Sequence, residues 1–569
     1  MKEHEQALEH RSSVTEIVAQ ERAHGGMAII NAILDHPQAL QLLRALEPEE
    51  MHALFAEIGR DDCVDLIRFA TIEQFQGLTD LDSWVNESFA PERLESLLNL
   101  AIGAGPETLD TFVEALEDEA LVLYLHKRAR VVARDFDPDQ DDEMSVPGIE
   151  AFHTPDTMFW IVLPADAPYF NDVRFIIERI YDRDHLDAAA LLRHVIYEDP
   201  DVLEDEARRF RSERVATMGF PSLADATALF DYLNPVRFKE RLNETLADLA
   251  PYDVEQRTLL PVLMGSYEGQ PAFLKKTLDG LTDDAARARI AEAVAYLANA
   301  IIVSRTGGDL SSTDGRAAGL RTALSIISIG LEYLADEDVD RARRVVTRVW
   351  PHTIFRVGYS LLIPLRGDAA KAMEYAGRTQ GFFLFDPPFN EIIAGLFEEP
   401  PQYSTALENA PRPRFRDFRS IHDVARAKAA LLQAMAVGMF VKSTLQLDVE
   451  KLAERVVEDR RKLTTHTTLM ATSLINALLG NDADPLAPID RADLTRIVDL
   501  VFAPATDRDE RTLNPRLTAA VAGFVGRTDN LFASALFDLS LRKLEDLFRR
   551  FPKGHIPEAR AAAPVLLMK

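Results

Sequence analysis

Hydrophobic positions in residues 43–128 recur in short runs, each preceded by a polar or proline-containing start. In "EPEEMHALFAEIG", Pro48 stands at a first helical position, where proline lacks only an N–H that would be unpaired anyway. Acidic residues follow it in the first turn, where they suit the helix dipole. The apolar residues after them share one helical face, and Gly59 follows the last of them. The pattern predicts a helix from Pro48 to about Gly59.

Further helix starts follow at short intervals. Thr71 has Gln74 three residues later, as in a capping box, and Pro91, Pro106 and Asp118 precede three more apolar runs. Each predicted helix is short, and isolated helices of fewer than about 12 residues are marginal in water. We therefore expect these helices to stack on one another, as the units of a superhelical repeat do.

The periodicity changes beyond residue 128. "TMFWIVLP" (157–164) is aromatic and β-branched and predicts a strand, with "KRARVVARDF" (127–136) as its candidate partner. Amphipathic helices are predicted in "DVRFIIERIYDRD" (172–184) and "DAAALLRHVIYED" (187–199). From about residue 251 the helical patterns are longer, and the proline-rich segment 398–415 interrupts them.

These patterns predict a mainly α protein with a small α+β middle segment and a large C-terminal helical part. The expected divisions are a short-helix superhelical domain at 1–130, an acidic linker at 131–150, an α+β segment at 151–250, and helical domains at 251–400 and 401–569, the last packed on the one before it. The alternating acids of the linker do not form a calcium loop, because Gly and Glu are missing from the positions that such a loop requires.

Composition narrows the classes of function. The chain has 569 residues, 47% of them hydrophobic, and its 63 basic and 92 acidic residues give a formal charge of −29. This balance argues against binding to nucleic acid or anionic lipid, which both require clustered cations. Solubility explains the acidity most simply, and the functional alternative is that the acidic residues bind a cation or a basic partner.

The single cysteine, Cys63, excludes an internal disulfide and a cysteine-rich metal site. Its acidic neighbours are expected to raise the pKa of its thiol, so we interpret it as a core residue rather than a nucleophile. The most apolar windows are shorter than the roughly 20 residues of a membrane span. We therefore expect a cytoplasmic protein with no membrane insertion, no cofactor and no metal-ligand set.

Two predicted helices carry polar stripes. In "PHTIFRVGYSLLIPLRG" (351–367), His352, Arg356 and Ser360 are spaced four residues apart and share one face, and Pro364 is expected to kink the end of the helix. In "LTTHTTLMATSLINALLGN" (463–481), which has no Asp, Glu, Lys or Arg, one face carries a second polar stripe. Its members are Thr465, Thr468, Thr472 and Asn476.

A buried polar stripe needs hydrogen-bond partners, because each unsatisfied group costs about 1–3 kcal/mol. The functional interpretation is that the two stripes line a polar pocket in which Arg356 binds a carboxylate or phosphate. The structural interpretation is a hydrogen-bonded seam between core helices, or a solvent-facing stripe in the first helix. Since buried polar groups are normally satisfied by the fold itself, the structural interpretation is favoured.

The "L-x-x-L-x-P-E-E…L…I-G-x-x-D…L-I" rhythm between Leu43 and Leu78 resembles the short-helix superhelix in the N-terminal domain of MgtE magnesium transporters. Flagellar motor-switch FliG proteins carry a similar rhythm. The likeness covers about residues 30–128 and implies a docking or regulatory module, but transport does not carry over, because no transmembrane region follows. Through "IFRVGYSLLIPLR" and "RFRDFRSIHDV", the whole chain also resembles an uncharacterised bacterial family that brings no known function with it.

The function that follows is a non-enzymatic scaffold, adaptor or regulatory protein that binds a protein partner through helical grooves. The alternative is a protein or enzyme that binds a small anionic ligand in its C-terminal helices near Arg356. A weaker alternative, prompted by the acidity and the MgtE-like rhythm, is a Mg²⁺-responsive regulator. The sequence leaves the oligomeric state open.

Overall fold

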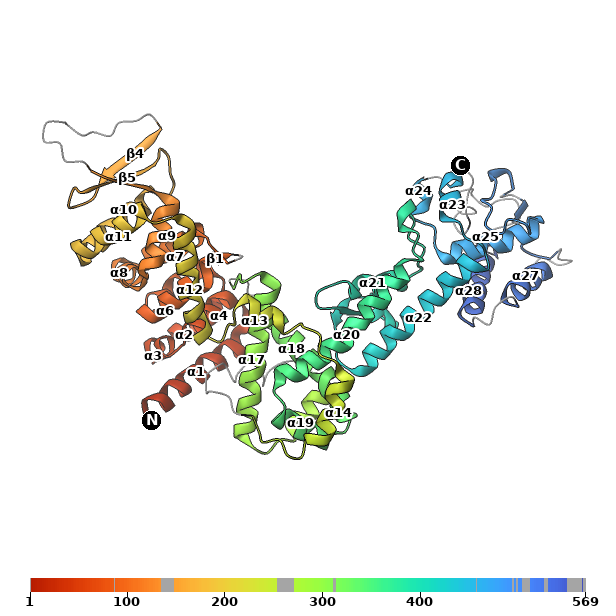
Figure 1. The fold of residues 1–569 in the computed structure, drawn as a ribbon, viewed down its shortest axis with the longest axis horizontal. Helices are drawn as coiled ribbons and strands as arrows, with labels where there is room; N and C mark the ends of the chain where they lie inside the picture. The colour runs from red at the N-terminus through yellow and green to blue at the C-terminus, as the bar shows by residue number, and fades with distance from the viewer. Residues whose placement is uncertain are drawn as a thin grey trace. The chain divides into compact units, whose positions relative to one another are not determined.

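The computed structural model describes residues 2–85, 87–134, 148–252, 271–310, 314–456, 458–493, 496–497, 500–503, 512–526, 531–549 and 565. It is mainly α, as predicted, with three small antiparallel sheets among the described residues (Figure 1). The chain forms two compact units, Met1–Val357 and Gly358–Lys569. The finer divisions expected from the sequence stay predictions, and most of the acidic linker lies outside the described residues.

The first unit begins with the predicted succession of short helices, which stack side by side (Figure 1). They are α1 (Lys2–Glu21), η1 (Arg22–His24), α2 (Gly26–Leu34), α3 (Ala39–Arg44), α4 (Pro48–Ile58), η2 (Arg60–Asp62), α5 (Val64–Ile67), α6 (Ile72–Asp82), α7 (Pro91–Ala104), α8 (Pro106–Ala115) and α9 (Asp118–Arg128). A two-stranded ribbon of β1 (Trp84–Val85) and β2 (Ser88–Phe89) separates α6 from α7.

Local capping explains where these helices begin. At α4 the side chains of Glu47 and Glu50 form a reciprocal capping box around Pro48, and the helix ends at Gly59, whose φ of 107° suits only glycine well. At α6, Thr71 and Gln74 form the predicted capping box. The predicted starts of α4, α6, α7, α8 and α9 are therefore all confirmed.

The predicted strand forms as β5 (Phe159–Pro164), the centre of a three-stranded sheet. It pairs antiparallel with β3 (Arg130–Ala133), as expected, and with β4 (Ile149–His153). Phe159, Ile161 and Leu163 alternate along β5 and are buried against the helices that follow. Those helices are α10 (Phe170–Arg183), α11 (His185–Tyr197) and α12 (Pro200–Thr217), the first two as predicted.

One continuous hydrophobic core runs from Val14 to Ala207, through α1–α12 and the inner face of the sheet. We call α1–α12 with this sheet the helical array. No short helix in it could bury its apolar face alone, so each is stabilised by its neighbours.

Buried ion pairs connect helices of the array that are not consecutive. Arg11 of α1 binds Glu50 of α4 at 2.7 Å. The fully buried Asp82 at the end of α6 accepts from His52 of α4 at 2.7 Å and also pairs with Arg60. Burial alone would raise the pKa of the Asp82 carboxyl, but its contacts with His52 and Arg60 lower it below its ordinary value. Removing one partner of such a pair is strongly destabilising, so the pairs fix how the helices stack.

The rest of the first unit is a helical bundle around the long antiparallel pair α17 and α18. Its helices are α13 (Leu223–Ala228), α14 (Pro235–Thr245), α16 (Ala272–Asp279), α17 (Asp284–Thr306), α18 (Asp314–Ala335), α19 (Val339–Arg348) and the start of α20 (Pro351–Met373).

The second unit has its own core, built mainly from the helices after residue 430. Its elements after α20 are η3 (Arg378–Gln380), α21 (Phe389–Leu396), β6 (Gln402–Ser404), η4 (Thr405–Glu408), β7 (Phe415–Asp417), α22 (Ile421–Ser443), α23 (Val449–Arg455), α24 (Glu458–Arg461), α25 (His466–Leu479), η5 (Arg491–Asp493), α27 (Pro515–Val525) and α28 (Leu531–Arg549). β6 and β7 pair antiparallel.

Two described helices are long and apolar enough to cross a membrane by length and composition alone. The window Ala318–Ala335 of α18 is 83% buried inside the protein, and α22 is 44% buried. The first is a core helix of a folded unit, and α22 packs into a core along only part of its surface.

Candidate functional site

Two of the three predicted stripe residues of α20, His352 and Arg356, lie in the first unit, and His352 packs beside an aromatic pair. The His352 ring packs edge-on against Trp350, with centroids 5.2 Å apart, and Trp350 packs against Tyr252 at 5.2 Å. Both stripe residues are half-buried. The sequence did not indicate that Tyr252 would join this group, because Tyr252 comes from a segment far from α20 along the chain.

The electrostatics of this group suit an anion. The pKa of the His352 imidazole is lowered, first by burial and then by the charge of Arg356, so the ring is neutral at pH 7. The Nε–H of Arg356 and the hydroxyl of Tyr252 are both buried and have no hydrogen-bond partner among the residues that the structure describes. A guanidinium with an unsatisfied N–H is suited to bind a carboxylate or phosphate.

The third member of this stripe, Ser360, lies in the second unit and is 1% exposed. The helix does not end near Gly367 as predicted but continues to Met373, with Pro364 inside it. Proline in a helix interior costs about 3 kcal/mol. Leu362 and Leu365 on either side are almost completely buried, and their packing offsets that cost.

The second predicted stripe lies at and along α25. Thr465 is not in the helix but is its N-cap, and it forms a capping box with Thr468. The Thr465 hydroxyl donates to Oδ1 of Asp386 at 2.7 Å, and the Thr472 hydroxyl donates to the carbonyl of Thr468 at 2.8 Å. Thr465 and Thr468 therefore fix the start of the helix.

Asn476 lies at the C-terminal end of the same stripe. Its amide donates to the carbonyls of Pro485 and Ala487, both at 2.9 Å, so it anchors the loop that follows α25. These contacts give the stripe structural partners, whereas ligand binding by it stays a prediction. The single pocket expected between the two stripes also stays a prediction, because His352 and Arg356 belong to one compact unit and α25 to the other.

A buried polar group at the start of α25 was not predicted from the sequence. The carboxylate of Asp386 accepts from the backbone N–H of Thr467 at 2.9 Å, and Nζ of Lys543 lies 3.9 Å away. Next to it, the ring of His466 packs edge-on against Phe385 at 5.4 Å. Burial lowers the pKa of His466 to about 4, and its Nε2 has no partner among the described residues. The histidine is thus neutral and enclosed.

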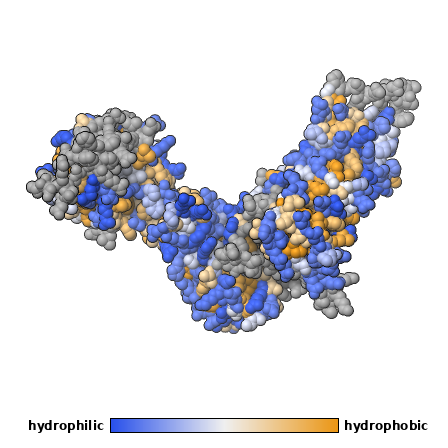
Figure 2. Space-filling view, turned by 180° about the vertical axis from the view of Figure 1, so that it is seen from behind, coloured by the Kyte–Doolittle hydropathy of each residue, from blue (hydrophilic) through white to orange (hydrophobic). Residues whose placement is uncertain are grey.

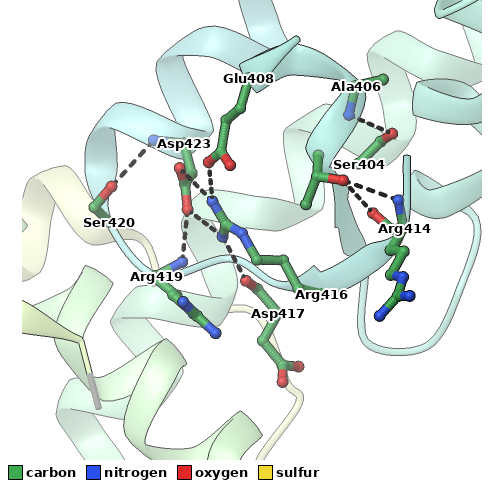
Figure 3. Close-up of polar contacts among 10 residues, drawn as sticks. Ser404, Ala406, Glu408, Arg414, Arg416, Asp417, Arg419, Ser420 and Asp423 are labelled. Atoms are coloured by element: carbon green, nitrogen blue, oxygen red, sulfur yellow. Dashed lines mark hydrogen bonds and ion pairs between the residues drawn. The ribbon is translucent and has the colours of Figure 1, made fainter. Parts of the chain in front are cut away.

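A second missed group surrounds Arg416 on β7 (Figure 3). Its guanidinium binds both carboxylate oxygens of Asp423, at 2.7 and 3.2 Å, and one oxygen of Glu408 at 2.6 Å. It also donates to the carbonyl of Asp417 at 2.9 Å and lies 4.1 Å from the centroid of the Tyr403 ring. We call this group the Arg416 clamp.

The clamp fixes the N-terminal turn of α22. Asp423 is 5% exposed and accepts the backbone N–H of Arg419 at 2.9 Å, while Ser420 caps the helix by accepting the Asp423 N–H. "RFRDFRSIHDV", one of the stretches that carried the family resemblance, holds the arginine, the capping serine and the buried aspartate together. In the part of the chain that the structure describes, no group of three or more His, Cys, Asp or Glu residues could hold a metal ion.

Fold and site together define a mainly α protein of two compact units, with a helical array in the first and a clamped, partly exposed helix in the second. A model of a family of unknown function (DUF6178) matches residues 5–567, and the chain belongs to this family. The expectation of an uncharacterised family is therefore confirmed, whereas the likeness to MgtE and FliG proteins is not. No curated protein and no solved structure matches the chain.

Proposed function

We propose that this protein is a non-enzymatic scaffold, adaptor or regulatory protein that binds a protein partner through the surface of its helical array. The observation that carries the proposal is the array itself, in which short helices share one core and are fixed by ion pairs between non-consecutive helices. A stack of this kind offers an extended surface. Because the surface is already ordered, little conformational entropy is lost when a partner binds.

Apolar side chains on the outside of the array support this proposal. Met27 is 57% exposed and Ile102 is 44% exposed, and Leu40 and Ile72 are also exposed. On the face of the molecule that Figure 2 shows, apolar residues form separate patches with hydrophilic residues around them. We place the protein in the cytoplasm, because the window Ala318–Ala335 of α18 is buried as a core helix of a folded unit.

The test is affinity purification of the tagged full-length chain from its host after in-cell cross-linking, quantified by mass spectrometry. A double variant, Met27→Gln with Ile102→Gln, removes apolar surface from the array, and Val236→Gln on α14 is the control, since Val236 is 57% exposed. We expect a stoichiometric protein partner whose recovery falls at least tenfold in the double variant only. If no protein is recovered in stoichiometric amounts, or if the double variant recovers it fully, the proposal is wrong.

A second candidate function is binding of a small anionic ligand, with or without catalysis, at Arg356. The buried Arg356 Nε–H, which has no hydrogen-bond partner among the described residues, favours it. Native mass spectrometry of the protein from its host tests it, with Arg356→Met compared against Arg344→Met on α19. A bound mass that is lost on unfolding and missing only from the Arg356 variant would support the candidate. The same bound mass in the natural chain and in both variants, or no bound mass in any of the three, would exclude it.

A further inference from the structure

The helix α22 is apolar on two opposite faces. Its inner face packs into the second unit and consists of buried residues centred on Ala427, Leu431, Ala434 and Val441. The outer face, half a turn away, carries a second apolar stripe, which we call the outer stripe. Its members are Ala425, Ala429, Leu432, Ala436 and Met439.

The outer stripe is open to solvent. Leu432 is 51% exposed and Met439 56% exposed, Ala425 and Ala429 are exposed, and Ala436 is half-buried. An ordinary surface helix places polar residues on its outer face, and a helix that is apolar all round is normally buried. This helix has an apolar outer face on which the Leu432 and Met439 side chains are more than half exposed.

The spacing of the outer stripe indicates what could cover it. Its residues follow one another at intervals of four, three, four and three residues. Apolar residues with this spacing are typical of a helix that packs along another helix. The seam extends over about 21 Å at 1.5 Å per residue. Three of its five residues are alanine, and small residues allow the backbone of a second helix to approach closely.

The charges beside the outer stripe are all positive. The only acidic residue of α22 is Asp423, which is buried and neutralised by Arg416, whereas Arg426, Lys428 and Lys442 are exposed. At the N-terminal end of α22 and on the adjoining hairpin, Arg412, Arg414 and Arg419 are exposed. Their guanidinium groups have no ion-pair partner within the described ranges (Figure 3 shows two of them). In a chain with a net charge of −29, this is a local concentration of cations.

We propose that the outer stripe of α22 binds an amphipathic helix of a partner protein that carries acidic residues beside its apolar seam. Pairing of two α22 helices in a second copy would bring cations against cations, which is unfavourable. A bilayer surface would select large aromatic and aliphatic residues rather than alanines. The proposal goes beyond the function assigned to the helical array, because it concerns a different surface in the other compact unit.

The experiment uses the purified full-length chain and a designed 21-residue fluorescent helix with leucine at the seam and glutamate beside it. One control peptide replaces the glutamates with lysines, and another has the glutamate peptide's composition in scrambled order. The variant is Leu432→Gln with Met439→Gln, and the matched control is Leu539→Gln on α28, which is 42% exposed in the same unit. Circular dichroism melting confirms that each variant is folded.

Fluorescence anisotropy is expected to show saturable binding of the glutamate peptide, at least tenfold weaker binding of both control peptides, and at least tenfold weaker binding of the glutamate peptide to the double variant only. Equal binding of the glutamate and scrambled peptides would overturn the proposal, because net charge alone would then explain it. Full retention of binding by the double variant would also overturn it.

The occupant in the cell is identified by a photo-cross-linking amino acid at Ala429, followed by sequencing of the attached peptide. A peptide from another protein with an acidic, apolar-seamed helical pattern is the expected result. Attachment to a second copy of this chain, to lipid, or to nothing above the level of the same label at Val236 would overturn the proposal. The recovery of an array partner does not depend on α22, so failure here and failure of the proposed function are distinguishable.

Discussion

The buried histidine at the start of α25 makes the stability of the second unit depend on pH. His466 is 2% exposed, and burial lowers its pKa from 6.5 to about 4, although the nearby Asp386 carboxylate opposes the shift. Between these two pH values the unfolded chain binds a proton that the folded chain does not. The stability contributed by the neutral ring is therefore complete above about pH 6.5 and is lost as the pH falls towards 4.

The size of the effect follows from the two pKa values. Each unit of difference between them corresponds to about 1.4 kcal/mol, so the full effect is about 3 kcal/mol, of which about 2 kcal/mol is lost by pH 5. The comparison variant is His466→Asn, which does not titrate. Its amide can still donate to the backbone of Tyr375, the hydrogen bond that also acts on the His466 ring.

The assay must report on the second unit alone. Tryptophan fluorescence cannot do so, because Trp84, Trp160 and Trp350 all lie in the first unit. Hydrogen exchange of peptides from α25, measured by mass spectrometry at pH 7.5 and pH 5, reports its local opening. We expect the opening free energy of the natural chain to fall by about 2 kcal/mol at the lower pH, and that of His466→Asn to change little. An equal fall in both proteins would refute the assignment of the pH dependence to this ring.

Three other predictions concern separate regions. Burial raises the pKa of Glu49 to about 7, so first-unit stability should fall as the pH rises from about 4.5 to 7 and above; Glu49→Gln should restore up to about 3 kcal/mol at pH 8, measured by tryptophan fluorescence in urea. Arg416→Met should cost the second unit about 3–5 kcal/mol, because it leaves the buried Asp423 carboxylate unpaired, and adding Asp423→Asn should recover part of this; hydrogen exchange of α22 measures both, and unchanged exchange would contradict the clamp. If the protein is a Mg²⁺-responsive regulator, its thermal midpoint should be higher in Mg²⁺ than in EDTA at matched ionic strength, and equal midpoints would exclude that role.

The features that the sequence predicted well depend on neighbours along the chain. Pro48, Thr71 and Pro91 begin helices because capping and the missing proline N–H act within one turn. The strand at Phe159–Pro164 was predictable for the same reason, since its alternation and composition are local. The end of the helix that contains Pro364 was not predictable from the local pattern, because the helix continues to Met373 with the proline inside it.

The features that the sequence analysis missed depend on long-range contacts. Nothing near Asp82 indicates that His52 will bind it, and nothing near Trp350 indicates that Tyr252 will pack on its ring. The threonine stripe of α25 was found from its spacing, but its partners Asp386 and Pro485 lie in other segments. The sequence shows that α22 is rich in apolar residues, yet only the structure shows which of its faces is covered.

The burial of Cys63 gives the helical array a built-in reporter of its own opening. The side chain is fully enclosed between η2 and α5, its thiol donates to the carbonyl of Gly59 at 3.3 Å, and burial with nearby acids raises its pKa to about 12. A thiol reagent reacts with thiolate, so the closed array is almost inert towards it at neutral pH. Because the chain has no other cysteine, every modified molecule records an excursion in which this part of the array came apart. Counting such molecules over time would measure, in living cells as well as in solution, how often the stack opens and whether a bound partner keeps it shut.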